Sequence, residues 1–102
     1  MDYDKLVRDR IPEIIELSGK QCIIEYCSDN NELKRRLVEK LSEEGEEYLE
    51  NFAEEELADL LQVVYSLIEM SDCKLEDIVE IMTEKMIARG GFSKGIILKN
   101  VN

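Results

Sequence analysis

Apolar residues recur every three or four positions along most of this chain, a period that predicts amphipathic helices. The pattern is clearest in two consecutive segments. In the first, expected from Asn30 to about Leu49 after a cap at Asp29, leucines at helical spacing lead directly to Glu44. The second, from about Ala53 to Met70, is apolar on nearly every side after Asp59, which is typical of a helix at the centre of a small domain.

Two further helices are expected near the ends of the chain. One covers roughly residues 9 to 18, with Asp9 as its cap and Pro12 in its opening turn. The other is opened by Asp72 or Lys74 and runs to Arg89, before the Gly90-Gly91 pair. Residues 21 to 27 between the first two helices read as a short extended connector or weak strand, and an apolar tail follows the last helix.

Composition agrees with an all-α fold, a four-helix bundle in one domain over residues 1–102. The chain has 102 residues, 44% of them hydrophobic and 36% charged, with a single proline. Its net charge of −11 argues against a nucleic-acid polymer or an anionic membrane as partner, because both would be repelled. With no apolar leader or membrane-spanning stretch, the protein is expected to be cytoplasmic.

Four carboxylates on the two central helices are the main candidate chemistry. Glu44 and Glu47 are spaced i,i+3, as are Glu56 and Asp59, so each pair lies on one helix face. A short link folds those faces towards each other. Glu44 and Asp59 fall at apolar positions, where an unpaired charge is costly, so a bound cation is expected. Oxygen ligands without any histidine favour Mg²⁺, with Mn²⁺ as an alternative, over zinc.

Magnesium commonly bridges protein carboxylates to phosphates, so hydrolysis of a nucleotide is the direct inference. The simpler interpretation is that acidic runs on helices are solvated faces, and from spacing alone the two readings are equally supported. On the last helix, Lys85 and Arg89 continue the apolar face of Ile78 and Met82. Their side chains either extend to solvent or bind a phosphate at the rim of the carboxylate cluster.

Four blocks in order resemble the MazG-like all-α nucleoside triphosphate pyrophosphohydrolases, in particular a short-chain branch related to phosphoribosyl-ATP pyrophosphohydrolase. They are KLVRDRIPEII, KLSEEGEE, ELADLLQVVYSL and RGGF, and together they cover nearly the whole chain. The pattern EExxE followed by ExxD is similar to the family's signature. Its two halves lie closer together here than in many members, so the loop that often shapes the base pocket is nearly missing.

The resemblance implies Mg²⁺-dependent cleavage of a nucleoside triphosphate, or of phosphoribosyl-ATP, between the α and β phosphates, giving the monophosphate and pyrophosphate. It implies Glu44, Glu47, Glu56 and Asp59 as metal ligands, with one of them or Glu43 aligning the attacking water. It also implies that Lys85 and Arg89 contact phosphate, and that the protein is a homo-oligomer, with a homodimer expected.

Several alternatives stay open at the level of sequence. The substrate could belong to histidine biosynthesis or to the house-cleaning of surplus nucleotides. Lys5, Arg8 and Arg10 have no role from the resemblance; they could reach phosphates, tie subunits together or be structural. The competing class is a non-catalytic helical dimerisation or regulatory module with a structural cation site.

Overall fold

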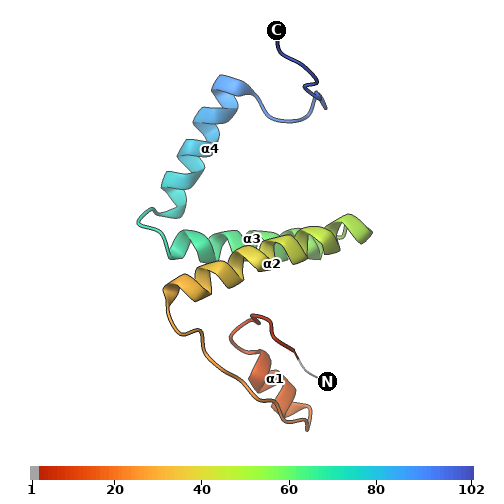
Figure 1. Cartoon of the computed structure of the whole chain (residues 1–102), viewed down its shortest axis with the longest axis vertical. Helices are drawn as coiled ribbons and strands as arrows, with labels where there is room; N and C mark the ends of the chain where they lie inside the picture. The colour runs from red at the N-terminus through yellow and green to blue at the C-terminus, as the bar shows by residue number, and fades with distance from the viewer. Residues whose placement is uncertain (1–2) are drawn as a thin grey trace.

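The computed structural model describes residues 3–102 and is built on an antiparallel pair of helices, α2 (Asn30–Asn51) and α3 (Glu54–Glu69), shown in Figure 1. The predicted cap of α2 is confirmed, because the carboxylate of Asp29 accepts a hydrogen bond of 2.8 Å from the backbone N–H of Glu32. The Glu32 carboxylate in turn accepts from the backbone N–H of Ser28 at 2.8 Å. The first bond satisfies an N–H group that the opening turn of α2 leaves without a helical partner, and the second ties the residue before the cap to the same turn.

The turn between α2 and α3 consists of Phe52 and Ala53 alone. Phe52 adopts a left-handed backbone conformation (φ 52°, ψ 31°), and its N–H donates to the carbonyl of Tyr48 at 2.6 Å. The side-chain oxygen of Asn51 accepts from the N–H of Ala53 at 3.0 Å. A single left-handed residue thus ends α2 and reverses the chain, and α2 extends two residues beyond the end expected at about Leu49.

The first helix is shorter than expected and is capped differently. α1 spans Ile11–Leu17, and Arg10 occupies its N-cap position without a side-chain hydrogen bond to the helix backbone. The expectation that Asp9 caps this helix is therefore wrong, because Asp9 lies one residue too early, in the preceding turn. The Arg10 side chain instead pairs with Glu13 of the first turn at 3.2 Å.

The last helix, α4 (Leu75–Arg89), follows Lys74 and stops at Gly90, whose φ of 84° suits glycine. It meets α3 near their connection and then leads away from the α2–α3 pair (Figure 1). The prediction of an all-α fold with four helices is confirmed. Residues 21 to 27 are an irregular connector, and the described part of the chain contains no strand.

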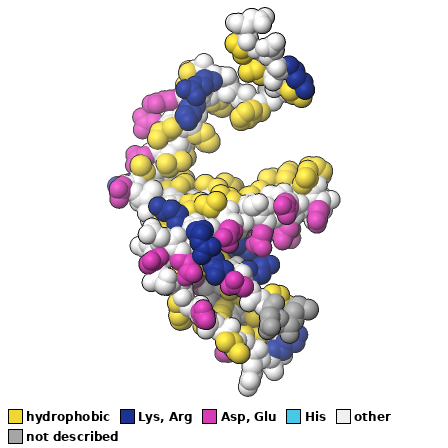
Figure 2. Space-filling view, in the orientation of Figure 1, with side chains coloured by type: hydrophobic (Ala, Val, Ile, Leu, Met, Phe, Trp, Pro, Cys, Tyr) yellow, Lys and Arg dark blue, Asp and Glu magenta, His cyan; other side chains and the backbone are white. Residues whose placement is uncertain are grey.

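One chain encloses very little core. Among residues 3–102 the buried apolar side chains are Leu37 and Val63, each 7% exposed. The radius of gyration is 17.9 Å, whereas a compact domain of this length has about 13 Å. Figure 2 shows hydrophobic side chains at the surface over α3, over α4 and in the tail, which does not pack back on the body. No helix in the described residues combines the length and apolarity needed to cross a membrane.

Candidate metal centre

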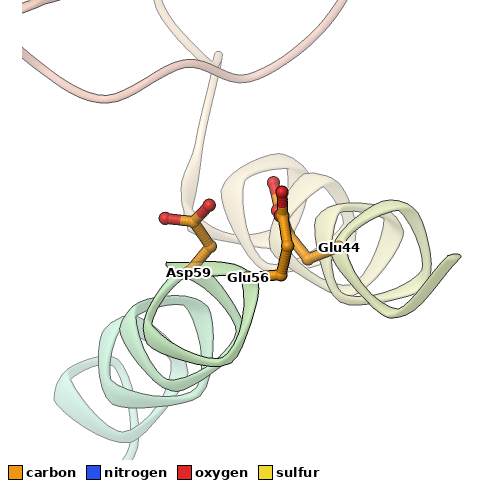
Figure 3. A group of neighbouring side chains, drawn as sticks. All are labelled: Glu44, Glu56 and Asp59. Atoms are coloured by element: carbon orange, nitrogen blue, oxygen red, sulfur yellow. The ribbon is translucent and has the colours of Figure 1, made fainter. Parts of the chain in front are cut away.

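Three of the four predicted ligands meet where α2 and α3 face each other. Glu44 comes from α2, and Glu56 and Asp59 come from successive turns at the start of α3. Each offers a carboxylate oxygen, and these atoms lie within 4.8 Å of one another. Figure 3 shows the side chains projecting from the helix pair on the side where the N-terminal segment runs. The spacing and ligand type could hold a cation.

The electrostatics of the cluster are unfavourable without a counter-charge. Glu44 is 7% exposed, and its Oε2 atom is shielded from solvent with no hydrogen-bond partner in the described part of the protein. The same is true of Oε2 of Glu56. Lys40, one turn earlier on α2, approaches the other oxygen of Glu44 at 3.7 Å. Two buried carboxylate oxygens from different helices therefore face a common space without donors.

Both glutamates hold protons more tightly than an exposed carboxyl would. Burial is the main cause that raises the pKa of Glu44, and the carboxylates of Glu47 and then Asp59 add to it, while Lys40 opposes them. Burial also leads in raising the pKa of Glu56, followed by Glu47, Asp59 and Glu44. A divalent cation would offset the cost of burying these charges and reduce their repulsion. The carboxylates therefore favour binding either protons or a cation.

Two predicted acids lie beside the cluster instead of in it. Glu47 is exposed and falls outside the closely spaced group, although its charge is felt at both buried glutamates. Glu43 is half-buried and lies between two lysines, with Lys5 at 3.9 Å and Lys40 at 3.7 Å. Glu43 and Glu47 thus lie on α2 before and after Glu44, next to the three central carboxylates.

The N-terminal segment brings a cation to the cluster that the helical pattern does not predict. Nη2 of Arg8 donates a hydrogen bond of 2.9 Å to Oδ1 of Asp59, 51 residues further along the chain. The only sequence signal is that three bases lie in the first ten residues, where three aspartates balance their charge. Since that segment is not helical up to Arg10, no periodicity argument could have placed Arg8 against α3.

The two predicted phosphate contacts are not brought to the carboxylates within one chain. Lys85 and Arg89 lie in the second half of α4, the part that leads away from α2 and α3 (Figure 1), and both are exposed. Their role stays a prediction. For Lys85 and Arg89 to contact a phosphate at the carboxylates, α4 of another copy would be required.

An apolar groove lies between α3 and α4, next to the metal centre along α3. Its lining begins at Ala58, adjacent to Asp59, and includes Leu61, Tyr65 and, from the start of α4, Leu75. None of the three central carboxylates lines it. The groove is an apolar surface, separate from the acidic chemistry.

Comparison with known proteins adds no family assignment: no protein-family model, curated protein or solved structure matches this chain. The resemblance of its motifs to the MazG-like enzymes therefore stays a prediction from sequence.

Proposed function

We propose that this protein is a metal-dependent nucleotide pyrophosphohydrolase of MazG-like type. It hydrolyses a nucleoside triphosphate, or phosphoribosyl-ATP, between the α and β phosphates and releases the monophosphate and pyrophosphate. Mg²⁺ is the proposed cofactor, and Mn²⁺ is its closest substitute.

One observation carries the proposal. Within the described residues, the Oε2 atoms of Glu44 and Glu56 are buried without hydrogen-bond partners beside Asp59, on two different helices. Ordinary solvated acids turn outwards and do not leave buried oxygens unpaired. Three carboxylates without nitrogen or sulfur ligands suit a hard cation that retains waters and can share a phosphate oxygen with the protein.

The residues divide into binding and positioning roles. Glu44, Glu56 and Asp59 would hold the cation, which when bound neutralises phosphate charge and lowers the pKa of a coordinated water. Glu47, exposed beside Glu44 and Glu56, would accept the proton of a water that attacks the phosphoanhydride. Glu43 is a weaker candidate for that role, because Lys5 and Lys40 already lie next to its carboxylate.

The proposed enzyme works as a homodimer or larger homo-oligomer. The face of α4 formed by Leu75, Val79, Met82 and Met86 is exposed in one chain, and a second copy is the occupant that would complete the missing core. In such an assembly α4 of one copy could place Lys85 and Arg89 near the carboxylates of the other, where they would bind phosphate oxygens.

The second candidate is a non-catalytic helical dimerisation or regulatory module with a structural cation. The scant core and exposed apolar faces favour an interaction role as much as they favour an oligomeric enzyme. The two functions differ in one consequence. A structural site would bind metal without hydrolysing a nucleotide, whereas an enzyme would bind metal and hydrolyse the nucleotide.

Pyrophosphate release should be measured with ribo- and deoxynucleoside triphosphates and phosphoribosyl-ATP, in Mg²⁺ and in EDTA. We expect Mg²⁺-dependent release of pyrophosphate with the matching monophosphate. Glu44→Gln and Asp59→Asn should each lower turnover by about a hundredfold or more, because each removes a charged metal ligand, while far-UV circular dichroism stays unchanged.

Glu46→Gln on α2 and Glu55→Gln on α3 are matched controls, since each removes one negative charge from an exposed position on the same helices. Both should keep wild-type turnover. Intact turnover in the Glu44 and Asp59 variants would exclude this metal centre as the active site. Metal binding without hydrolysis of any tested nucleotide would favour the regulatory module.

A further inference from the structure

The segment before α1 is tied to the metal-centre side of the α2–α3 pair by charge. Within the described residues three ionic contacts hold it: Asp4 to Arg36 at 3.1 Å, Lys5 to Glu43 at 3.9 Å and Arg8 to Asp59 at 2.9 Å. Arg36 also donates to the backbone carbonyl of Asp4 at 3.2 Å. Of the apolar side chains in this segment, Leu6 is half-buried and Val7 is exposed.

These contacts differ in what they touch. The Asp4 and Lys5 contacts are made with residues of α2 outside the three central carboxylates. Arg8 is the member that engages one of those carboxylates, through the only hydrogen bond between the segment and α3 in the described part of the chain. Its guanidinium therefore neutralises Asp59 where a divalent cation would also bind.

The pairing is exchangeable in physical terms. The side chain of Arg8 is 57% exposed and that of Asp59 is 39% exposed, and solvent screening makes such an exposed pair weak. A divalent ion held by three carboxylates would attract Asp59 more strongly than Arg8 does. The guanidinium would be released at the rim of the site, with its five donors free.

We propose that Arg8 is a ligand-binding residue of this centre with two alternating partners. It pairs with Asp59 when no divalent cation is bound, and it pairs with a phosphate oxygen of the metal-bridged polyphosphate when one is. The inference rests on the proposed function and assigns phosphate binding to the N-terminal segment of the same chain.

Two features support this assignment beyond the acidic cluster itself. The buried, unpartnered Oε2 of Glu44 points to a cation that Arg8 does not replace, since Arg8 reaches Asp59 alone. In addition, Arg36 of α2 contacts both the carboxylate and the backbone carbonyl of Asp4, and these contacts do not involve the central carboxylates, so they would keep the segment beside the centre after Arg8 is released. A planar guanidinium fork matches phosphate oxygens in a way that a solvated ammonium does not.

The test measures binding directly, with Mn²⁺ followed by electron paramagnetic resonance and inorganic triphosphate followed by calorimetry. Arg8→Gln should bind Mn²⁺ about two- to fivefold more tightly, because Asp59 loses its competitor. The same variant should bind inorganic triphosphate, in saturating Mn²⁺, about tenfold more weakly, because a charge-assisted hydrogen bond is lost. Arg8→Lys should recover part of the triphosphate affinity.

Arg10→Gln is the matched control, since it removes the same charge two residues away, where Arg10 pairs with Glu13 of α1. It should leave both affinities unchanged. Triphosphate affinity in Arg8→Gln equal to that of Arg10→Gln would overturn the proposal, as would absence of Mn²⁺ binding in the wild type. If both affinities shift as expected while no nucleotide is hydrolysed, Arg8 keeps its role and the proposed enzyme activity fails.

Discussion

At the scale of single residues, protons and any bound cation would compete for the buried carboxylates. Burial, together with neighbouring carboxylates, raises the pKa of Glu44 and of Glu56 above the ordinary glutamate value of 4.5. In the pH range between that value and the raised pKa, the folded protein binds more protons than the unfolded chain. Stability from these groups is therefore complete below the unfolded pKa and is lost as pH rises through the folded pKa.

We predict that the free energy of unfolding of the metal-free protein falls as pH rises from about 4.5 towards neutrality. Glu44→Gln should reduce this slope, and at neutral pH it should raise the free energy of unfolding by about 1 kcal/mol, because it removes a buried charge near other acids. Urea denaturation at several pH values, in EDTA, measures both quantities.

Glu46→Gln is the control for overall charge, because it removes the same charge from an exposed position and should keep the wild-type slope. Parallel slopes for Glu44→Gln and Glu46→Gln would contradict the burial argument. Mg²⁺ at a hundred times its dissociation constant should add about 2.7 kcal/mol at neutral pH, and little in Glu44→Gln.

At the scale of elements, the two-residue turn determines whether the carboxylates meet. Phe52 in its left-handed conformation and the extended Ala53 set α3 antiparallel to α2, which brings Glu56 and Asp59 opposite Glu44. The N–H of Phe52 bonded to Tyr48, and the contact of their rings at 5.4 Å, hold the end of α2 in place. The register of this helical hairpin is therefore part of the metal centre.

Insertion of two glycines between Phe52 and Ala53 should weaken Mn²⁺ binding by about tenfold or more. The longer turn lets α3 shift along α2, so that three oxygens no longer converge within one coordination shell. Mn²⁺ titration followed by electron paramagnetic resonance measures the loss, and far-UV circular dichroism verifies that helix content is kept.

Asp29→Ala is the comparison variant for that insertion. It removes the N-cap bond of α2 at the opposite end from the turn, so it should cost about 1 kcal/mol of stability and leave Mn²⁺ affinity unchanged. If the glycine insertion also leaves affinity unchanged, the turn does not set the geometry of the centre.

At the scale of the whole molecule, one chain leaves its apolar surface uncovered. Leu75, Val79, Met82 and Met86 recur at steps of four, three and four residues, so they form one stripe on α4, and all are exposed. With two buried apolar side chains and a radius of gyration of 17.9 Å, the described chain lacks the core that a stable monomer of this length needs.

We predict that the protein is a homodimer or larger homo-oligomer in solution, and that Met82→Glu shifts it towards monomer. Burying a carboxylate in an apolar interface without a partner is unfavourable by several kcal/mol. Light scattering coupled to size-exclusion chromatography measures the mass, and the variant should also lose thermal stability, because its core is completed by the partner copy.

Ala88→Glu is the control, since it adds the same charge to an exposed position on the face of α4 opposite the stripe. It should keep the wild-type mass. A wild-type protein that is monomeric and well folded at micromolar concentration would contradict both the assembly and the proposal that α4 of a second copy supplies Lys85 and Arg89.

Local signals were sufficient for much of this structure. The cap at Asp29, the four helices and the convergence of Glu44, Glu56 and Asp59 were all predictable, because caps and helical spacing act over a few residues and the link between α2 and α3 is short. The start of α1 was not, because Asp9 is a residue type favoured at the N-cap, whereas Arg10 takes that position without making a side-chain cap.

The sequence by itself therefore determined the all-α class, the approximate positions of the helices and the carboxylates that could hold a cation. Tertiary structure alone decided that Arg8 meets Asp59 across 51 residues, that Glu47 stands outside the central three and that α4 carries Lys85 and Arg89 away from them. The physical reason is the distance along the chain over which each kind of signal acts. Helical periodicity places side chains on a face, whereas the path of an irregular segment and the direction of a helix after a turn depend on contacts between distant parts of the chain.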